Sequence, residues 1–176
     1  AMICTLSVYN GFEELISMLY SEIDPQIEVR AATGKTLQTT SPEIEKLYTI
    51  EGVEAVTPVI EDNALAIFGE NQLPVVIKGV PQNYSSVANI EDALIDGRTS
   101  FADSIPRTVI GVGVSNNLKV APHFISPIYL YAPKRMSKVN LVNPASSFNT
   151  SQVYCSGVFS ISQPEYDDRT IYVPIS

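Results

Sequence analysis

The segment Ala64-Leu-Ala-Ile-Phe-Gly-Glu-Asn-Gln-Leu-Pro-Val-Val-Ile-Lys-Gly-Val80 holds two runs rich in β-branched and aromatic residues, separated by Gly69-Glu-Asn-Gln72. Such side chains favour strands, and a short polar segment with glycine favours the turn between two strands. A third run of the same kind, Val53 to Ile60, comes before them and is separated from them by Glu61-Asp-Asn63. We therefore predict a meander of three strands in this part of the chain.

Helix-forming patterns lie on both sides of this meander. Ser41-Pro42-Glu43 favours a helix start, because serine accepts bonds from free backbone amides, proline fits the first helical position and glutamate suits the positive end. That helix would turn Ile44, Leu47 and Tyr48 inward and end at Gly52. Further helices are predicted over about 10–23, 83–94 and 112–118.

Most of the remaining sequence has the pattern of strands. The predicted strands cover 26–31, 108–111, 126–132, 139–142, 152–161 and 170–175. The first hundred or so residues thus mix helices and strands, whereas the last fifty are nearly all β. This order favours an α+β fold.

The composition limits the class of protein. A chain of 176 residues fits one large domain or two small ones. With 45% hydrophobic and 17% charged residues, it is too apolar for disorder and too often interrupted by polar residues for a membrane bundle. No stretch reaches the roughly 18–20 apolar residues that cross a bilayer. Residues 1–10 lack the features of a signal peptide, and we expect the chain to be a segment of a longer protein.

The charge is acidic overall and unevenly distributed. The net charge of −8 disfavours a nucleic-acid partner, and a single histidine and two cysteines leave little for a metal site or a histidine-based triad. We expect no catalytic residue, no metal and no cofactor. Residues 1–103 hold sixteen acidic and five basic side chains, a net of −11, while residues 104–176 hold three and six, a net of +3. This asymmetry suggests two substructures.

Two glycines after a predicted strand are similar to the opening of a phosphate-binding loop. In Gly111-Val-Gly113-Val-Ser115 the position of the third glycine is Asn116, and no acidic residue follows at the expected distance. We therefore favour close packing of strand and helix over a nucleotide site. The segment also lacks the closing glycine of a nucleophile elbow, and His123 is better explained as a surface loop residue.

The cysteines and the paired carboxylates have alternative interpretations. Sequence spacing does not pair Cys4 with Cys155, and we predict that Cys155 is a buried free thiol. The pairs Glu61-Asp62, Glu91-Asp92 and Asp167-Asp168 contain the carboxylates that acid–base chemistry or calcium binding requires. Each pair falls where a solvated turn or a helix N-terminus is expected, so we favour solvation over catalysis.

A basic loop is the candidate binding site. Lys134, Arg135 and Lys138 lie within five positions of one another, with Met136 among them, between a predicted strand and the turn at Asn143-Pro144. One interpretation is a solvated hairpin tip. The other is an exposed loop that docks an acidic partner or anionic headgroups.

Several short segments spread over nearly all of the chain form a recognisable series. In chain order they are Leu6-Ser-Val-Tyr-Asn-Gly-Phe12, Ile77-Lys-Gly-Val80 with Tyr84, Gly111-Val-Gly113, Tyr131-Ala-Pro133, Asn143-Pro144 with Phe148, Ser156-Gly-Val-Phe-Ser160 and Glu165-Tyr-Asp167. Their order and spacing resemble the extracytoplasmic core domain of FtsX-like ABC transporter permeases. The similarity is greatest to the lipoprotein-releasing LolC and LolE branch, with the MacB export permease more distant.

The resemblance implies a domain organisation. Residues 1–23 would be a membrane-proximal helix that continues a transmembrane helix, 24–120 a mixed α/β (porter-like) subdomain, and 121–176 a smaller, mostly β subdomain. The segment would be periplasmic, in a protein of the bacterial inner membrane. In this family the domain transmits motion driven by ATP, so the resemblance implies no enzyme activity in this chain and ATP hydrolysis on a separate subunit.

The resemblance also implies partners. These are the cognate ATPase subunit and a second permease copy or a paralogue, with a periplasmic chaperone or lipoprotein as a further candidate. In LolC-type subunits a hairpin loop captures the chaperone, and the segment from Lys134 to Phe148 occupies the corresponding position. Its residues differ from the proline-bracketed hook of that family. Two other hypotheses are a stand-alone secreted module that binds a small ligand or glycan, and a regulatory permease that recruits a cell-wall hydrolase.

Overall fold

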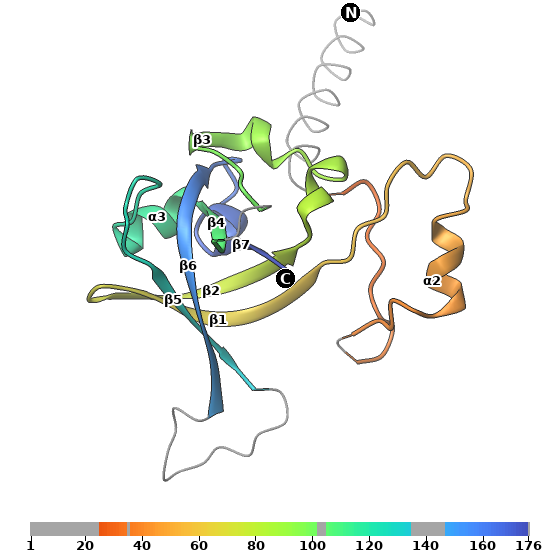
Figure 1. The fold of residues 1–176 in the computed structure, drawn as a ribbon, viewed down its shortest axis with the longest axis horizontal. Helices are drawn as coiled ribbons and strands as arrows, with labels where there is room; N and C mark the ends of the chain where they lie inside the picture. The colour runs from red at the N-terminus through yellow and green to blue at the C-terminus, as the bar shows by residue number, and fades with distance from the viewer. Residues whose placement is uncertain (1–24, 35, 102–104, 135–146, 176) are drawn as a thin grey trace, which may run out of the picture.

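The computed structural model describes residues 25–34, 36–101, 105–134 and 147–175. The chain is an α+β fold in which short helices accompany one mixed sheet (Figure 1). In order, the elements are α2 (Pro42–Leu47), β1 (Ile60–Phe68), β2 (Asn71–Val80), the 3₁₀ helices η1 (Gln82–Ser86) and η2 (Ile90–Ala93), β3 (Leu94–Gly97), β4 (Arg107–Gly111), α3 (Val112–Leu118), β5 (Ile128–Pro133), β6 (Phe148–Phe159), α4 (Pro164–Asp167) and β7 (Thr170–Pro174).

The sheet closes on itself through its longest strand. Its order is β3-β6-β4-β7-β2-β1-β5, and β5 also pairs with β6, so the pairings from β6 round to β5 form a ring. The pairs β2–β7 and β4–β6 are parallel, and the other pairs are antiparallel. The first half of β6 pairs with β5 and its second half with β3 and β4. Strand β6 therefore contributes its second half to the body of the domain and its first half to a two-stranded extension that it forms with β5.

The centre of the sheet is buried on both faces. Successive residues of a strand point to opposite faces, so Ile171 joins a core that contains α3, whereas Tyr172 joins a core that contains η1 and η2. Val109 and Ile110 of β4 divide in the same way. Two apolar cores thus hold the sheet between α3 and the 3₁₀ helices.

The predicted meander is a hairpin of two strands. Residues 53–59 form no strand, and Glu61-Asp-Asn63 lie inside β1 instead of in a turn. The antiparallel pairing runs without interruption from Ile60↔Gly79 to Phe68↔Asn71, and at the polar end of β1 the side chains are exposed or half-buried. Continuous pairing with β2 therefore determines the strand, although its sequence has the polar composition of a turn.

Two other predictions at the N-terminal side were wrong. Gln26-Ile-Glu-Val-Arg-Ala31 forms no strand, and the helix predicted over 83–94 is instead η1 and η2, followed by β3. The Ser86 hydroxyl donates to the Asn83 carbonyl oxygen at 2.7 Å, and such local side-chain bonds compete with a continuous helix. Leu94 and the residues after it pair with β6. The helix predicted over 10–23 and the strand predicted over 139–142 lie outside the described residues.

Helix α2 begins at Pro42 as predicted, but it has no buried residue. Ile44 and Leu47 are half-buried, and Tyr48 is 60% exposed, so the expected inward face does not form. The strand before Gly111 and the helix over 112–118 are confirmed as β4 and α3.

The predicted subdomain boundary at about residue 120 falls between α3 and β5. Strands from both sides of this boundary join the same sheet, because β6 and β7 flank β4. The division into two subdomains stays a prediction.

Candidate functional site

Strand β5 and the first half of β6 form a two-stranded ribbon, in which Ile128–Pro133 pair with Phe148–Val153. This ribbon extends from the body of the domain (Figure 1). Strand β5 pairs with β1 only over Tyr129–Tyr131, whereas its pairing with β6 continues to Pro133↔Phe148. Beyond this pair, the Lys134 N–H donates to the Ser147 carbonyl oxygen at 2.9 Å. The ribbon is therefore held by main-chain bonds up to the point where the basic loop begins.

The register shows which backbone groups of the ribbon face outward. Bonded pairs alternate along an antiparallel ladder, so the bond between Lys134 and Ser147 implies that residues 149, 151 and 153 also bond with β5. The N–H and C=O groups of Phe148, Thr150 and Gln152 then face the opposite edge. Farther along this outer edge, the Tyr154 N–H donates to the carbonyl oxygen of Pro106, the residue before β4, at 2.9 Å.

The predicted binding residues begin at the end of this ribbon. Lys134 is exposed, directly after the last residue of β5. Arg135, Met136 and Lys138 lie outside the described residues. From Ser147 to Ser156 the chain carries no charged side chain, and Phe148 and the four residues after it are exposed.

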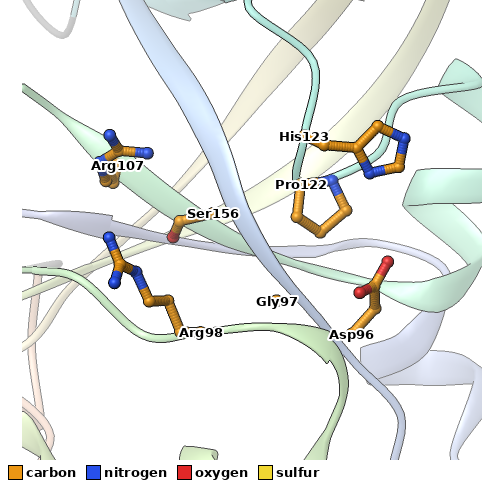
Figure 2. Close-up of a pocket in the computed structure, with 7 residues that line it drawn as sticks. All are labelled: Asp96, Gly97, Arg98, Arg107, Pro122, His123 and Ser156. Carbon is orange, nitrogen blue, oxygen red and sulfur yellow. The ribbon is translucent and has the colours of Figure 1, made fainter.

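An open cleft of about 440 Å³ lies near the body end of the ribbon (Figure 2). Figure 2 shows the guanidinium groups of Arg98 and Arg107 on one side of it, and His123 and Asp96 on the other. The Arg98 N–H donates to the Ser156 carbonyl oxygen at 2.8 Å. The cleft is lined by Asp96, Gly97, Arg98, Arg107, Pro122, His123 and Ser156.

Gly97 permits the close approach of chains at this cleft. Its φ is +78°, a left-handed conformation that glycine adopts at little cost. A Cβ at this position would overlap the Ser156 carbonyl oxygen and the Gly157 Cα. The glycine therefore keeps Arg98 close against β6.

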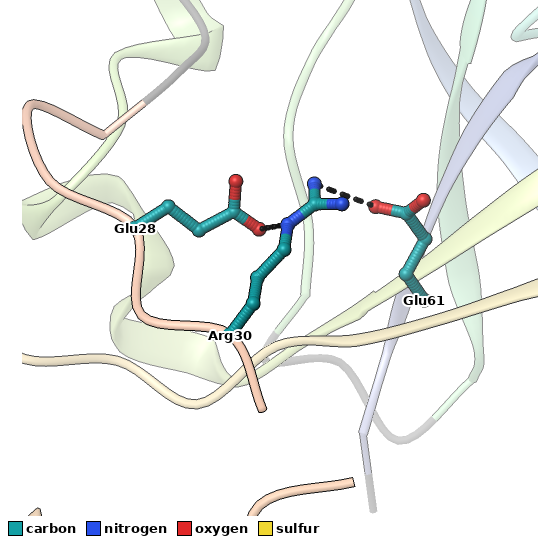
Figure 3. Close-up of polar contacts among 3 residues, drawn as sticks. All are labelled: Glu28, Arg30 and Glu61. Atoms are coloured by element: carbon teal, nitrogen blue, oxygen red, sulfur yellow. Dashed lines mark hydrogen bonds and ion pairs between the residues drawn. The ribbon is translucent and has the colours of Figure 1, made fainter. Parts of the chain in front are cut away.

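A charged contact ties the segment before α2 to the sheet (Figure 3). Arg30 Nε lies 2.6 Å from Glu28 Oε1, and one of its terminal nitrogens lies 4.0 Å from Glu61 Oε2. The hydrogen bond that Arg30 donates to the Glu28 carboxylate is the largest cause that raises the pKa of Arg30. All three side chains are exposed, so this contact contributes little to stability.

The glycines singled out in the sequence serve packing. A Cβ at Gly111 would overlap the Asp167 carbonyl oxygen, and a Cβ at Gly113 would overlap the Asp168 side chain. The end of β4 and the first turn of α3 therefore pack closely against the end of α4, in line with the packing interpretation. His123 is exposed, as predicted, and lies edge-on to Phe124.

Cys155 is a buried free thiol, as predicted. Burial raises its pKa to about 12, which leaves almost no thiolate at neutral pH. Cys4 lies outside the described residues.

The acidic pairs have local roles. Asp167 is buried, and its carboxylate accepts bonds from the Ser160 hydroxyl at 3.0 Å and the Ile161 N–H at 2.9 Å. Glu91 accepts a bond from the Thr99 hydroxyl at 2.5 Å. Within the described ranges, no three acidic, histidine or cysteine side chains gather as metal ligands would. No helix in those ranges is long and apolar enough to cross a membrane.

The outer edge of β6 and the arginine cleft were missed in the sequence. The predicted strand began at Gln152, because Phe148-Asn-Thr-Ser151 has no alternation of apolar and polar residues. The two arginines of the cleft are nine positions apart and belong to different strand ends. The only available signal was the continuation of β propensity before Gln152.

Comparisons with known proteins concern the fold. No protein-family model matches the sequence, and no curated protein matches it. The structure is similar to the extracellular domain of the noncanonical ABC-type transporter YknZ from Gram-positive bacteria, at a TM-score of 0.50 and 18% sequence identity. The match covers 77% of this chain and 65% of that one, so this chain spans less than two thirds of the neighbour's length. At this identity the likeness supports the α+β fold.

Proposed function

We propose that this chain is an extracytoplasmic domain of an ABC transporter permease, which transmits motion and docks a partner. The observation that carries the proposal is the similarity of its fold to the extracellular domain of YknZ. In this proposal the domain is not an enzyme, and ATP is hydrolysed on a separate subunit. The permease acts with a second copy or a paralogue.

The ribbon is suited to passing motion from the body to a partner. Strand β6 is continuous from Phe148, which is 40% exposed, to Phe159, which is fully buried. A tilt of the body therefore moves the ribbon without an intervening hinge loop. This geometry supports a mechanical role for the domain, of the kind in which rigid elements rotate together.

The finer part of the proposal is release of lipoproteins from the membrane, in the manner of the LolC and LolE branch, with the ribbon loop capturing a periplasmic chaperone or lipoprotein. Its location would then be the periplasmic side of a bacterial inner membrane. The exposed Lys134 at the end of the ribbon supports a docking role for the basic loop.

Co-purification tests the general proposal. The full-length protein, expressed with its cognate ATPase subunit and extracted in mild detergent, should recover that subunit and a second permease chain. Recovery of neither would refute the proposal. For the docking loop, Lys134, Arg135 and Lys138 are changed together to glutamate, with Lys46→Glu as an exposed control distant in sequence. Loss of lipoprotein release in the loop variant alone is the expected result, and equal release would remove the loop's proposed role.

A further inference from the structure

We propose that the outer edge of β6, from Phe148 to Gln152, binds an extended acidic segment of a partner protein, which joins the sheet as an added strand. This inference rests on the proposed function, because it specifies how the same ribbon holds a partner. Its chemistry is main-chain hydrogen bonding along the edge, with charge at both ends selecting the partner.

The edge has the bonding groups that an added strand needs. Phe148, Thr150 and Gln152 direct their N–H and C=O groups away from β5, and no residue in the described part of the chain bonds them there. The side chains from Phe148 to Gln152 are all exposed. An added strand would pair with the same edge of β6 that pairs with β4 farther along the strand, beginning where Arg107 pairs with Tyr154.

The two edges of the ribbon differ in how well they are protected against pairing with a further strand. On the β5 side, β1 covers Tyr129 to Tyr131, and the next outward position is Pro133, which has no N–H to donate. On the β6 side, Phe148-Asn-Thr-Ser-Gln152 contains no proline and no charge, the residues that usually block an exposed edge. Among the residues that the structure describes, the β6 edge of the ribbon is thus the one left open to pairing.

Charge identifies an acidic segment as the occupant. Lys134 lies exposed at the tip end of the ribbon, and Arg98 and Arg107 lie at the cleft near its body end. Asp96 lines the same cleft, so the described charges nearest the ribbon are three cations and one carboxylate, a net of +2. Although the whole chain is −8, interactions between exposed charges more than about 8 Å apart are largely screened at physiological salt. The local charge beside the ribbon is therefore net cationic.

The same charges disfavour a second copy of this chain as the occupant. Two β6 edges would pair antiparallel about a two-fold axis, in the register that is centred on Thr150. In that arrangement Lys134 of each copy approaches Arg107 of the other, so like charges meet at both ends of the pairing. An acidic segment meets opposite charge at both ends.

Amide hydrogen exchange and peptide titration test the inference. In the free domain, the amides of residues 149, 151 and 153 should be protected, while those of Phe148, Thr150 and Gln152 exchange freely. The probe is an eight-residue peptide of alternating glutamate and threonine with blocked termini. Its addition at millimolar concentration should protect the three outward amides, and a peptide with lysine in place of glutamate should bind at least tenfold more weakly.

A proline substitution isolates the main-chain bond. Thr150→Pro removes an N–H that faces away from β5, so the ribbon keeps its pairing and the unfolding midpoint should stay within about 3 °C. Peptide protection should be lost in Thr150→Pro and kept in Thr150→Ala, which retains the N–H. If the proline variant does not fold, Phe148→Pro at the end of the ribbon provides the same test.

Three results would overturn the inference. These are no protection by either peptide, equal binding of the acidic and basic peptides, and concentration-dependent dimers of the free domain that Thr150→Pro abolishes. The last result would assign the edge to a second copy. None of them alters co-purification of the full-length protein with its ATPase subunit, so failure of this inference is distinct from failure of the proposed function.

Discussion

Removal of the Asp167 carboxylate should destabilise the domain by about 2–3 kcal/mol. The carboxylate accepts bonds from the Ile161 N–H and the Ser160 hydroxyl, and it joins the end of β6 to α4. In Asp167→Ala the buried Ile161 N–H loses its partner, which costs about 1–3 kcal/mol. The half-buried Ser160 hydroxyl can bond to water instead, so its loss adds less than about 1 kcal/mol.

Two further variants separate these contributions. Asp167→Asn keeps one acceptor oxygen for Ile161 without the charge, and it should cost about 1 kcal/mol, the usual difference between a charged and a neutral acceptor. Ser160→Ala should cost less than about 1 kcal/mol. Glu165→Ala is the control, since this carboxylate of α4 is exposed, and it should stay within about 0.5 kcal/mol of the wild type.

Urea unfolding followed by far-UV circular dichroism measures these differences, because the chain has no tryptophan to report by fluorescence. The slope m should be the same in every variant, so that the shift in midpoint gives the change in stability. The reasoning is refuted if Asp167→Ala unfolds within about 0.5 kcal/mol of the wild type, or if Ser160→Ala loses as much as Asp167→Ala.

Four other predictions concern packing, the buried thiol and the surface ion pair. Gly111→Ala should destabilise by more than about 2 kcal/mol, because its Cβ overlaps the backbone of α4. Gly79→Ala should cost less, because its Cβ meets side chains alone, those of Ile175 and Ile60, at 3.1 Å or more; urea midpoints compare the two variants. Cys155 should react with a disulfide reagent at pH 8 at least about 10²-fold more slowly in the folded domain than in urea, because burial raises its pKa to about 12 from an ordinary 9.0 and also blocks access to the sulfur; a Cys4→Ser background makes it the reporting thiol. The same raised pKa makes stability fall between pH 9 and 12, because the unfolded thiol ionises first, and Cys155→Ala should flatten that part of the pH profile relative to the wild type. Arg30→Ala should change the unfolding free energy by less than about 0.5 kcal/mol, and a larger loss would show that its exposed ion pairs matter more than their geometry indicates.

The buried strands were the predictable part of the fold. Thr108-Val-Ile-Gly111 and Thr170 onward are short apolar runs, and they became β4 and β7 at the centre of the sheet, where both faces are buried. The helix over 112–118 was predicted because it follows directly from such a strand. In these segments local propensity and tertiary burial favour the same structure, so pattern alone was sufficient.

The sequence failed where pairing partners decide the structure. Gln26 to Ala31 alternates as a strand should, yet no strand pairs with it in the described ranges. Glu61-Asp-Asn63 has the composition of a turn, yet β2 pairs with it throughout. Whether a segment finds a neighbouring strand depends on residues far away in sequence, and that information is absent from a local window.

The candidate site was predictable only in the part that depends on local sequence. The basic cluster that begins at Lys134 is visible in the sequence, and its place after a strand predicted a hairpin tip. The open edge beside it was not visible, because a strand that buries neither face has no hydrophobic period to detect. Only the register, through the bond between Lys134 and Ser147, reveals which groups of β6 face outward.

Cationic side chains beside the proposed edge should give it its selectivity. Lys134 lies at the tip end of the ribbon, and Arg98 and Arg107 line the cleft near its body end, so an acidic segment is attracted locally. Added salt screens this attraction, so peptide binding at Thr150 should weaken as the salt concentration is raised. If binding at this edge were unaffected by salt, the main-chain bonds alone would hold the peptide, and the cations at the two ends would have no part in choosing it.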